Sequence, residues 1–200
     1  MNKKISRRSV VFGAAAGFVL LKAAPLLAQV TDPAARRIQT YYSTLLPAVL
    51  QTQGMSVGER ARRISPAVLG IFDIGLMVRL AVGPSWSRFS GAQQGALREA
   101  FASFTVADYA SQLGDYSGEN AVVDPVVETR GGDRLVKTRI GSTQINYLVR
   151  GSRVVDVYAN GTVSELANRR AEFTSILASG TPDTLIQTLR QRTRTLIGGG

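Results

Sequence analysis

The sequence predicts an α+β domain in which a four-stranded antiparallel meander is packed by helices from both ends of the chain. Three observations lead to this fold class. Apolar residues recur at helical spacing between residues 32 and 113, at a spacing of two between 120 and 159, and again at helical spacing from 162 to 197. Helices, then strands, then helices in one chain are typical of an α+β domain rather than of alternating βαβ units.

Four helix starts are predicted in the first half of the domain. Each has a capping Asp or Ser. In three of the four, a following proline or a Glu/Gln three residues later strengthens the prediction. These starts are Asp32-Pro33, Ser56-x-x-Glu59, Asp73 and Ser90-x-x-Gln93. Gly83-Pro84 and Gly114 should end the third and fourth helices. Pro47 is expected to kink or split the first helix, because proline lacks the amide hydrogen that a helix interior uses.

The middle of the chain is rich in Val, Ile, Thr and Tyr, which favour strands. Strands are predicted near residues 120–130, 134–141, 143–150 and 153–159. Gly131-Gly132-Asp133 and Gly151-Ser152 supply turns, and the second suits a two-residue hairpin. Tyr147-Leu148-Val149 and Val154-Val155 are apolar on both faces, so these strands should be covered on both sides or line a cavity.

Two helices are predicted after the strands. Thr162-x-x-Glu165 reads as a capping box for a helix that Gly180 closes, and Thr181-Pro182-Asp183 starts the last helix. The three glycines at 198–200 are expected to be disordered. With no repeat or low-complexity linker, residues 29–197 are predicted to form a single domain.

Residues 1–28 have the three parts of a secretory signal peptide. A basic start (Lys3, Lys4, Arg7, Arg8) precedes an apolar run from Val10 to Leu21 and small residues ending at Ala28. Ser6-Arg7-Arg8-Ser9 followed by Val-Val-Phe resembles a twin-arginine signal, with general secretion as the other route. An uncleaved anchor is the alternative, but the run is shorter than the roughly 18 residues that span a bilayer. We therefore expect the mature protein in the bacterial periplasm.

The composition excludes several chemistries. The 200 residues contain no His and no Cys. Zinc fingers, iron–sulfur clusters, Cys nucleophiles, Ser-His-Asp triads and disulfides are therefore excluded. Carboxylate or Ser/Lys chemistry remains, as does binding without reaction. We expect no metal and no cofactor.

The formal charge of +10 suggests an anionic partner, although the predicted signal peptide carries five of those charges. The remaining cations include two clusters of arginine predicted to lie on exposed helix faces. These are Arg60/Arg62/Arg63 and Arg190/Arg192/Arg194. Nucleic acid is disfavoured because no exposed aromatic residues are interleaved with them for stacking on bases. Solvated helix faces explain both clusters, with transient contact with anionic membrane lipids or an acidic partner as the second interpretation.

No pair of carboxylates has a diagnostic spacing. The candidates are Asp73, Asp108, Asp115, Glu119, Asp124, Asp156, Glu165 and Glu172. Asp156, inside a predicted strand, is expected to pair with Arg169 or Arg170, since buried carboxylates usually have partners. The glycines match neither a P-loop nor a dinucleotide-binding fingerprint.

Two groups of motifs carry a family resemblance over residues 35–190. The first is Phe72-Asp73-Ile74-Gly75-Leu76-Met77 with Gly83-Pro84-Ser85-Trp86, Phe101 and Tyr109; the second is the segment from Asp156 through Gly161 to Leu166, followed by Arg169-Arg170 and Glu172-Phe173. Together they resemble the MlaC/toluene-tolerance (Ttg2-type) family of periplasmic phospholipid-binding proteins. Segments 81–86, 116–119 and 127–130 are most similar to the hopanoid-associated branch, HpnM. Arg153 stands where the wider family often has Trp, which predicts a different cavity shape.

The resemblance implies an apolar cavity between sheet and helices that holds acyl chains or a polycyclic lipid. It also implies a carrier rather than an enzyme, moving lipid between an inner-membrane ABC-type complex and an outer-membrane acceptor. The candidate pocket residues are Phe72, Leu76, Met77, Leu80, Phe101, Phe104, Tyr147, Val155 and Val157, any of which plain core packing would also explain. The structural motif residues are Trp86, Asp156, Gly161, Arg170 and Phe173. A periplasmic adaptor that binds a protein without lipid, and a carboxylate hydrolase, are the alternatives.

Overall fold

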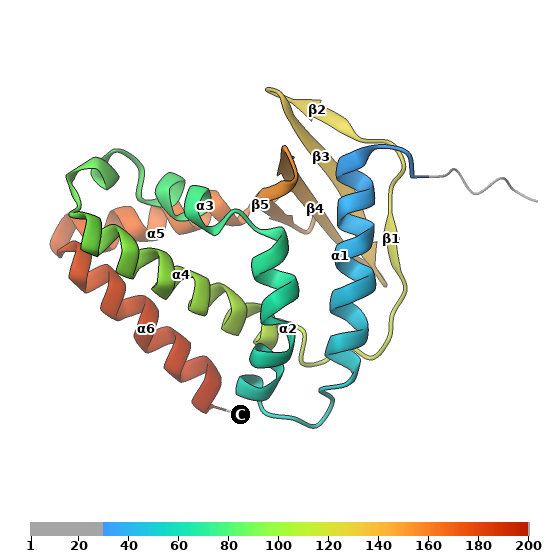
Figure 1. Cartoon of the computed structure of the whole chain (residues 1–200), viewed down its shortest axis with the longest axis horizontal. Coiled ribbons are helices and arrows are strands. Elements are labelled where there is room, and N and C mark those ends of the chain that lie inside the picture. Colours follow the sequence, from blue (N-terminus) through green and yellow to red (C-terminus); the bar gives the residue numbers. More distant parts are fainter. Residues whose placement is uncertain (1–29, 200) are drawn as a thin grey trace, which may run out of the picture.

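The computed structural model describes residues 30–199, so the predicted signal peptide lies outside the described residues. Figure 1 shows a twisted sheet crossed on one face by helix α1, with a group of helices formed by α3, α4, α5 and α6 beside it and α2 between the two parts. Among residues 30–199, no helix is both long enough and apolar enough to cross a membrane.

The helices of the first half begin at the predicted caps. They are α1 (Pro33–Leu50), α2 (Val57–Ile71), α3 (Ile74–Val82), the 3-10 helix η1 (Gly83–Arg88) and α4 (Gly91–Gln112). The Asp32 carboxylate accepts a hydrogen bond from the Ala34 amide at 2.8 Å, and both predicted capping boxes are formed. Helix α1 continues through Pro47 to Leu50, so Pro47, which lies in the last turn, does not split the helix.

The sheet has six strands, two more than predicted. They are β1 (Ala121–Val123), β2 (Glu128–Arg130), β3 (Asp133–Ile140), β4 (Thr143–Arg150), β5 (Arg153–Ala159) and β6 (Val163–Ser164). Strands β3, β4 and β5 form the predicted antiparallel meander, and the two-residue connection at Gly151-Ser152 is confirmed. The segment predicted as one strand near 120–130 is two short strands that both pair with β3, separated around Pro125, which cannot donate to a ladder.

A β-bulge interrupts the pairing of β4 and β5. Leu148 pairs with Asp156 and Val149 pairs with Val154, so Val155 is an extra residue with no partner of its own. The regular alternation of side chains between the two faces is therefore broken between Val154 and Val157.

The last two helices are α5 (Glu165–Ser179) and α6 (Pro182–Gly198). Ser164, not Thr162, caps α5, because residues 163–164 first pair with β5 as strand β6. Gly198 ends α6, and the Gly199 amide donates to the Thr195 carbonyl at 3.1 Å; the disorder expected for the glycine tail stays a prediction. Gly200 lies outside the described residues.

Arg60 points into the protein rather than outward as predicted. Its residue is only 6 % exposed, and its guanidinium donates to the carbonyls of Ala110 at 2.9 Å and Met55 at 3.3 Å. Ala110 lies in the last turn of α4, where backbone carbonyls have no partner within the helix. Arg60 thus joins α2 to the end of α4, while Arg62 and Arg63 are exposed as expected.

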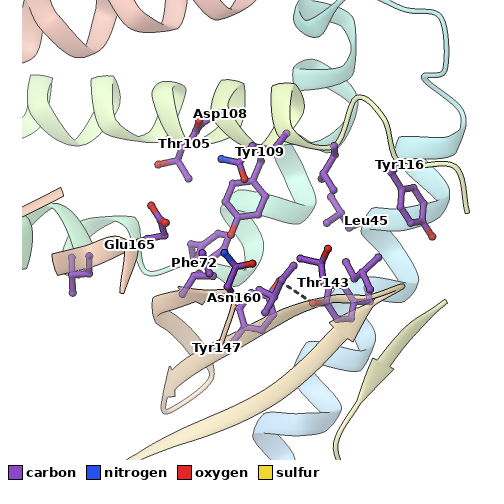
Figure 2. Close-up of a pocket in the computed structure, with 18 of the residues that line it drawn as sticks. Leu45, Phe72, Thr105, Asp108, Tyr109, Tyr116, Thr143, Tyr147, Asn160 and Glu165 are labelled. Atoms are coloured by element: carbon purple, nitrogen blue, oxygen red, sulfur yellow. Dashed lines mark hydrogen bonds between the residues drawn. The ribbon is translucent and has the colours of Figure 1, made fainter. Parts of the chain in front are cut away.

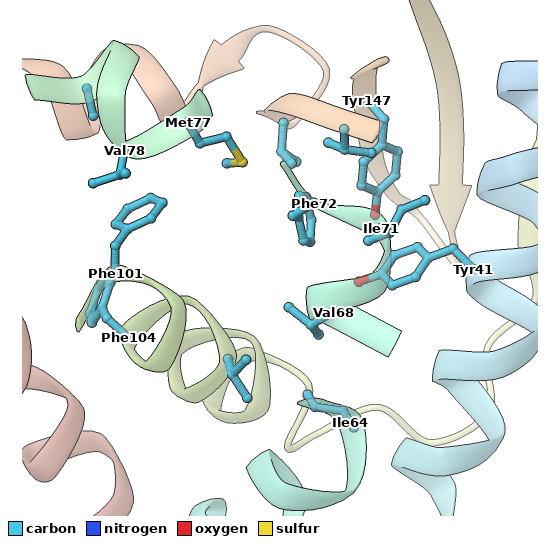
Figure 3. Close-up of a cluster of buried hydrophobic side chains, with 14 of the residues drawn as sticks. Tyr41, Ile64, Val68, Ile71, Phe72, Met77, Val78, Phe101, Phe104 and Tyr147 are labelled. Carbon is cyan, nitrogen blue, oxygen red and sulfur yellow. The ribbon is translucent and has the colours of Figure 1, made fainter. Parts of the chain in front are cut away.

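The hydrophobic core lies among the six α-helices and strands β3, β4 and β5. Figure 3 shows Tyr41 of α1 and Tyr147 of the sheet beside Phe72, and Phe101 of α4 opposite Val78 of α3. The Tyr41 ring meets those of Phe72 and Tyr147 edge-on, with centroids 6.2 and 6.3 Å apart. These aromatic contacts fix α1 and the α2–α3 corner against β4.

Candidate functional site

A cavity of about 430 Å³ lies between the sheet and helices α1, α3, α4 and α5. Its inner wall is apolar. Leu45 comes from α1, Phe101 and Phe104 from α4, and Tyr147 and Val157 from the sheet. Figure 2 shows Leu45, Tyr109 and Tyr147 converging on this space from three different elements. Helices on one side and a sheet on the other thus enclose an apolar space open to solvent at one end.

Six of the nine predicted pocket residues line this cavity. They are Phe72, Met77, Phe101, Phe104, Tyr147 and Val157. Their contact with a ligand stays a prediction.

Leu76, Leu80 and Val155 are outside the lining, which corrects their assignment. Leu76 and Leu80 lie one turn apart on α3; Leu76 is half-buried and Leu80 is 36 % exposed. Strict alternation with Val157 would place Val155 on the cavity face, and the bulge breaks that alternation.

The sequence analysis missed several lining residues on α1, α4 and the β3–β4 hairpin. They include Tyr42, Leu45, Thr105, Tyr109, Ile140 and Ile145. A signal was present for Thr105, which follows Phe101 by four residues on the same helix face. No local pattern identified the lining residues of α1, because an apolar stripe looks the same in the sequence whether it packs against the core or lines a cavity.

Hydroxyl groups at the base of the cavity bond to one another. The Tyr42 hydroxyl is hydrogen-bonded to those of Thr138 at 2.7 Å and Tyr147 at 3.0 Å, and Thr138 donates to the Ile145 carbonyl. Burial raises the pKa of Tyr42 and raises that of Tyr147 well above its ordinary value. The base is therefore uncharged at neutral pH, and its polar atoms are compatible with an apolar ligand.

Arg169 of α5 forms part of the side wall. Its guanidinium contacts the carboxylates of Asp108 at 3.0 Å and Glu172 at 3.3 Å, and it stacks 4.7 Å from the centre of the Phe104 ring. Since Asp108 and Phe104 belong to α4, Arg169 fastens α5 to α4 beside the cavity.

Asp156 bonds to the start of α5 and not to an arginine as predicted. Its buried carboxylate accepts hydrogen bonds from the amides of Val157 at 2.8 Å and Leu166 at 3.0 Å, and from the Ser164 hydroxyl at 2.6 Å. Three donors replace the expected guanidinium. Asp156 thereby fixes the first turn of α5, the helix that carries Leu166 and Arg169 into the cavity lining.

The other motif residues support the walls. Phe173 is fully buried and meets the lining residue Phe101 edge-on at 6.0 Å. Trp86 of η1 packs against Phe89 with ring centres 6.1 Å apart. Neither Phe173 nor Trp86 lines the cavity.

The last two motif residues, Gly161 and Arg170, are each associated with a glycine of positive φ. Gly161 has φ of +78°, in the left-handed region that favours glycine, and its carbonyl accepts a hydrogen bond from the Asn146 side chain at 3.0 Å. Arg170 packs against Gly83, which also has positive φ, so a side chain at position 83 would meet the guanidinium.

Four carboxylates line the cavity, those of Asp108, Asp115, Glu119 and Glu165. Asp108 is ion-paired with Arg169. The pKa of Glu119 is lowered by hydrogen bonds from its own amide and from the Ser117 hydroxyl and amide. Among described carboxyl groups whose pKa departs from the ordinary value, all are lowered.

Residues 42–191 match the family model for MlaC protein. The chain belongs to the MlaC family. This confirms the family resemblance, while membership of the HpnM branch stays a prediction. No curated protein matches this MlaC chain.

A solved structure is similar to this MlaC-family chain over most of both chains. It is a phospholipid-binding protein from Ralstonia solanacearum in complex with a phospholipid. The TM-score is 0.72 at 17 % identity, covering 82 % of this chain and 98 % of that one. The likeness confirms the predicted fold class, helices packed on an antiparallel sheet.

Proposed function

We propose that this MlaC-family chain is a periplasmic lipid carrier that binds phospholipid or a hopanoid in the cavity between sheet and helices. The apolar cavity of about 430 Å³ carries this proposal. The phospholipid in the similar Ralstonia protein supports it, because that protein has the same fold.

The physical chemistry of the cavity supports lipid binding without catalysis. Each buried CH₂ group contributes about 0.8 kcal/mol, so an acyl chain needs no charged partner to bind. The phenols at the base are bonded to one another, so a hydrocarbon chain placed there leaves no new unpaired polar group. A lipid-free adaptor would not need such a space.

We further propose that the carrier moves lipid between an inner-membrane ABC-type complex and an outer-membrane acceptor. Residues 1–28 would direct export as a twin-arginine-like signal peptide. Exposed arginines such as Arg62 and Arg63 would support transient contact with anionic membrane surfaces.

Organic extraction of the purified protein, followed by mass spectrometry, tests lipid binding. We expect co-purified lipid from the wild type and a strong reduction in Val157→Trp, whose indole would fill space on the cavity wall. Val122→Trp is the matched control, since Val122 is 48 % exposed on β1 and outside the lining. A wild type that yields no lipid, or a Val157→Trp variant that is folded and fully loaded, would refute the proposal.

A further inference from the structure

The solvent-exposed end of the cavity, which we call the mouth, is rich in carboxylates. The mouth consists of the exposed lining residues Gln112, Asp115, Glu119, Ser142, Thr143 and Asn160. Glu165, half-buried at the start of α5, also lines the cavity. The ion pairs of residues 30–199 include none for Asp115, Glu119 or Glu165. The hydrogen bonds to Glu119 lower its pKa, so it is ionised at neutral pH.

The arginines near the mouth are engaged elsewhere. Arg169 is shared between Asp108 and Glu172. Arg139 donates to the Gly141 carbonyl at 3.1 Å, on the hairpin beside the mouth. A negatively charged lipid head at the mouth would lie beside the carboxylates of Asp115, Glu119 and Glu165, while the lining residue Arg169 is already paired with two other carboxylates.

Tyr109 is a second, independent feature that points to a polar ligand group. Figure 2 shows it extending from α4 toward Asn160 and Tyr147 across the cavity. Its hydroxyl forms no hydrogen bond with the described part of the chain, yet burial raises its pKa far above the ordinary value, assisted by Tyr42 and nearby Asp108. Tyr109 is half-buried and lines the cavity, so its hydroxyl is available to a polar atom of a ligand.

We propose that the cavity selects lipids whose head donates hydrogen bonds and carries no net negative charge, such as amine-bearing or hydroxyl-bearing heads. The inference rests on the proposed lipid-carrier function. Carboxylates only accept hydrogen bonds, so an ammonium or hydroxyl head complements Asp115, Glu119 and Glu165. An anionic head repels them. The Tyr109 hydroxyl adds one contact to the polar atoms of the lipid backbone below the head.

A competition experiment tests this selection. The delipidated protein is incubated with vesicles that contain equal amounts of dioleoyl phosphatidylethanolamine, diacylglycerol and phosphatidylglycerol, and is then re-isolated for lipid analysis. All three lipids share one vesicle surface, so the arginines that meet the membrane affect them equally. We expect phosphatidylglycerol to be depleted roughly tenfold relative to each of the other two.

Two sets of variants locate the effect. Asp115→Asn/Glu165→Gln should reduce the depletion to roughly twofold, because two of the three unpaired charges are removed. The matched control Glu99→Gln/Asp124→Asn removes two carboxylates outside the lining and should keep the wild-type preference. Tyr109→Phe should lower total loading roughly fivefold, the effect of one net hydrogen bond, and keep the head preference.

The outcomes separate the two proposals. Equal or preferred loading of phosphatidylglycerol by the wild type overturns the head selection while lipid binding stands. A preference that persists unchanged in Asp115→Asn/Glu165→Gln also overturns it. If the folded wild type takes up none of the three lipids, both the selection and the proposed carrier function fail.

Discussion

Replacing Asp156 tests whether one buried carboxylate holds helix α5 against the sheet. In Asp156→Ala, the amides of Val157 and Leu166 and the hydroxyl of Ser164 all lose their acceptor. A hydrogen bond to a charged group contributes about 1.5–3 kcal/mol, and half-buried Ser164 can turn toward water. We therefore expect the free energy of unfolding to fall by roughly 3–5 kcal/mol.

Asp156→Asn is the matched control. The amide has the same shape, and its one oxygen can still accept from the two backbone amides, while the Ser164 hydroxyl can rotate to accept from the new NH₂ group. The loss of charge should cost only about 1 kcal/mol. The contrast between the two variants isolates the hydrogen bonds from the packing volume.

Urea unfolding followed by far-ultraviolet circular dichroism measures both free energies. In a thermal scan, Asp156→Ala should melt roughly 6–20 °C below the wild type, at about 2–4 °C per kcal/mol for a domain of this size. Lipid loading should fall as well, because α5 carries Leu166 and Arg169 into the cavity lining. A loss below about 1 kcal/mol in Asp156→Ala, or equal losses in the two variants, would refute the anchoring role.

Three further predictions follow from other contacts. Arg60→Ala should lower the free energy of unfolding by about 2–3 kcal/mol in urea, because the buried guanidinium holds the end of α4; an effect near zero would contradict this. The Arg150 hydrogen bond lowers the pKa of Asp133 below its ordinary 3.8, so Asp133 stabilises the fold above that pH. Asp133→Asn should cost about 0.5–1 kcal/mol at neutral pH, a difference that disappears as the pH falls through the lowered pKa; a constant difference down to pH ~2 would argue against the ion pair. Phe104→Asp should abolish lipid loading, whereas Leu80→Asp, outside the lining, should not; equal loading of both folded variants would exclude Phe104 as a wall residue.

The helix starts could be predicted because a cap is a local property. The side chains of Ser56 and Ser90 each accept a hydrogen bond from the amide three residues later. The residues that form each cap therefore stand together in one short segment of the sequence. The two-residue hairpin was equally local. The capping box predicted at Thr162 was wrong, because residues 163–164 pair with β5 as strand β6 before α5 begins.

The cavity could be predicted only in part. Phe101 and Phe104 were found because large apolar residues on a helix stripe face inward wherever the helix packs. Arg60 was misplaced because its carbonyl partner Ala110 lies 50 residues away along the chain. Val155 was misplaced because one extra residue in β5 reverses the pattern that periodicity assumes. Periodicity says which face is apolar, and only the packing of other elements decides whether that face meets a side chain or a space.

The hydrogen bond between Tyr42 and Tyr147 joins residues 105 positions apart, so the base of the cavity is among the most non-local parts of the molecule. Contacts of such long sequence separation are slow to form, because the loop between them must first be closed. A chain that ends before β4 has Tyr42 but lacks Tyr147 and Val157, the sheet residues that form the opposite wall of the cavity. The cavity should therefore be a late product of folding, and bound lipid would report that the whole domain, from first helix to last strand, has assembled.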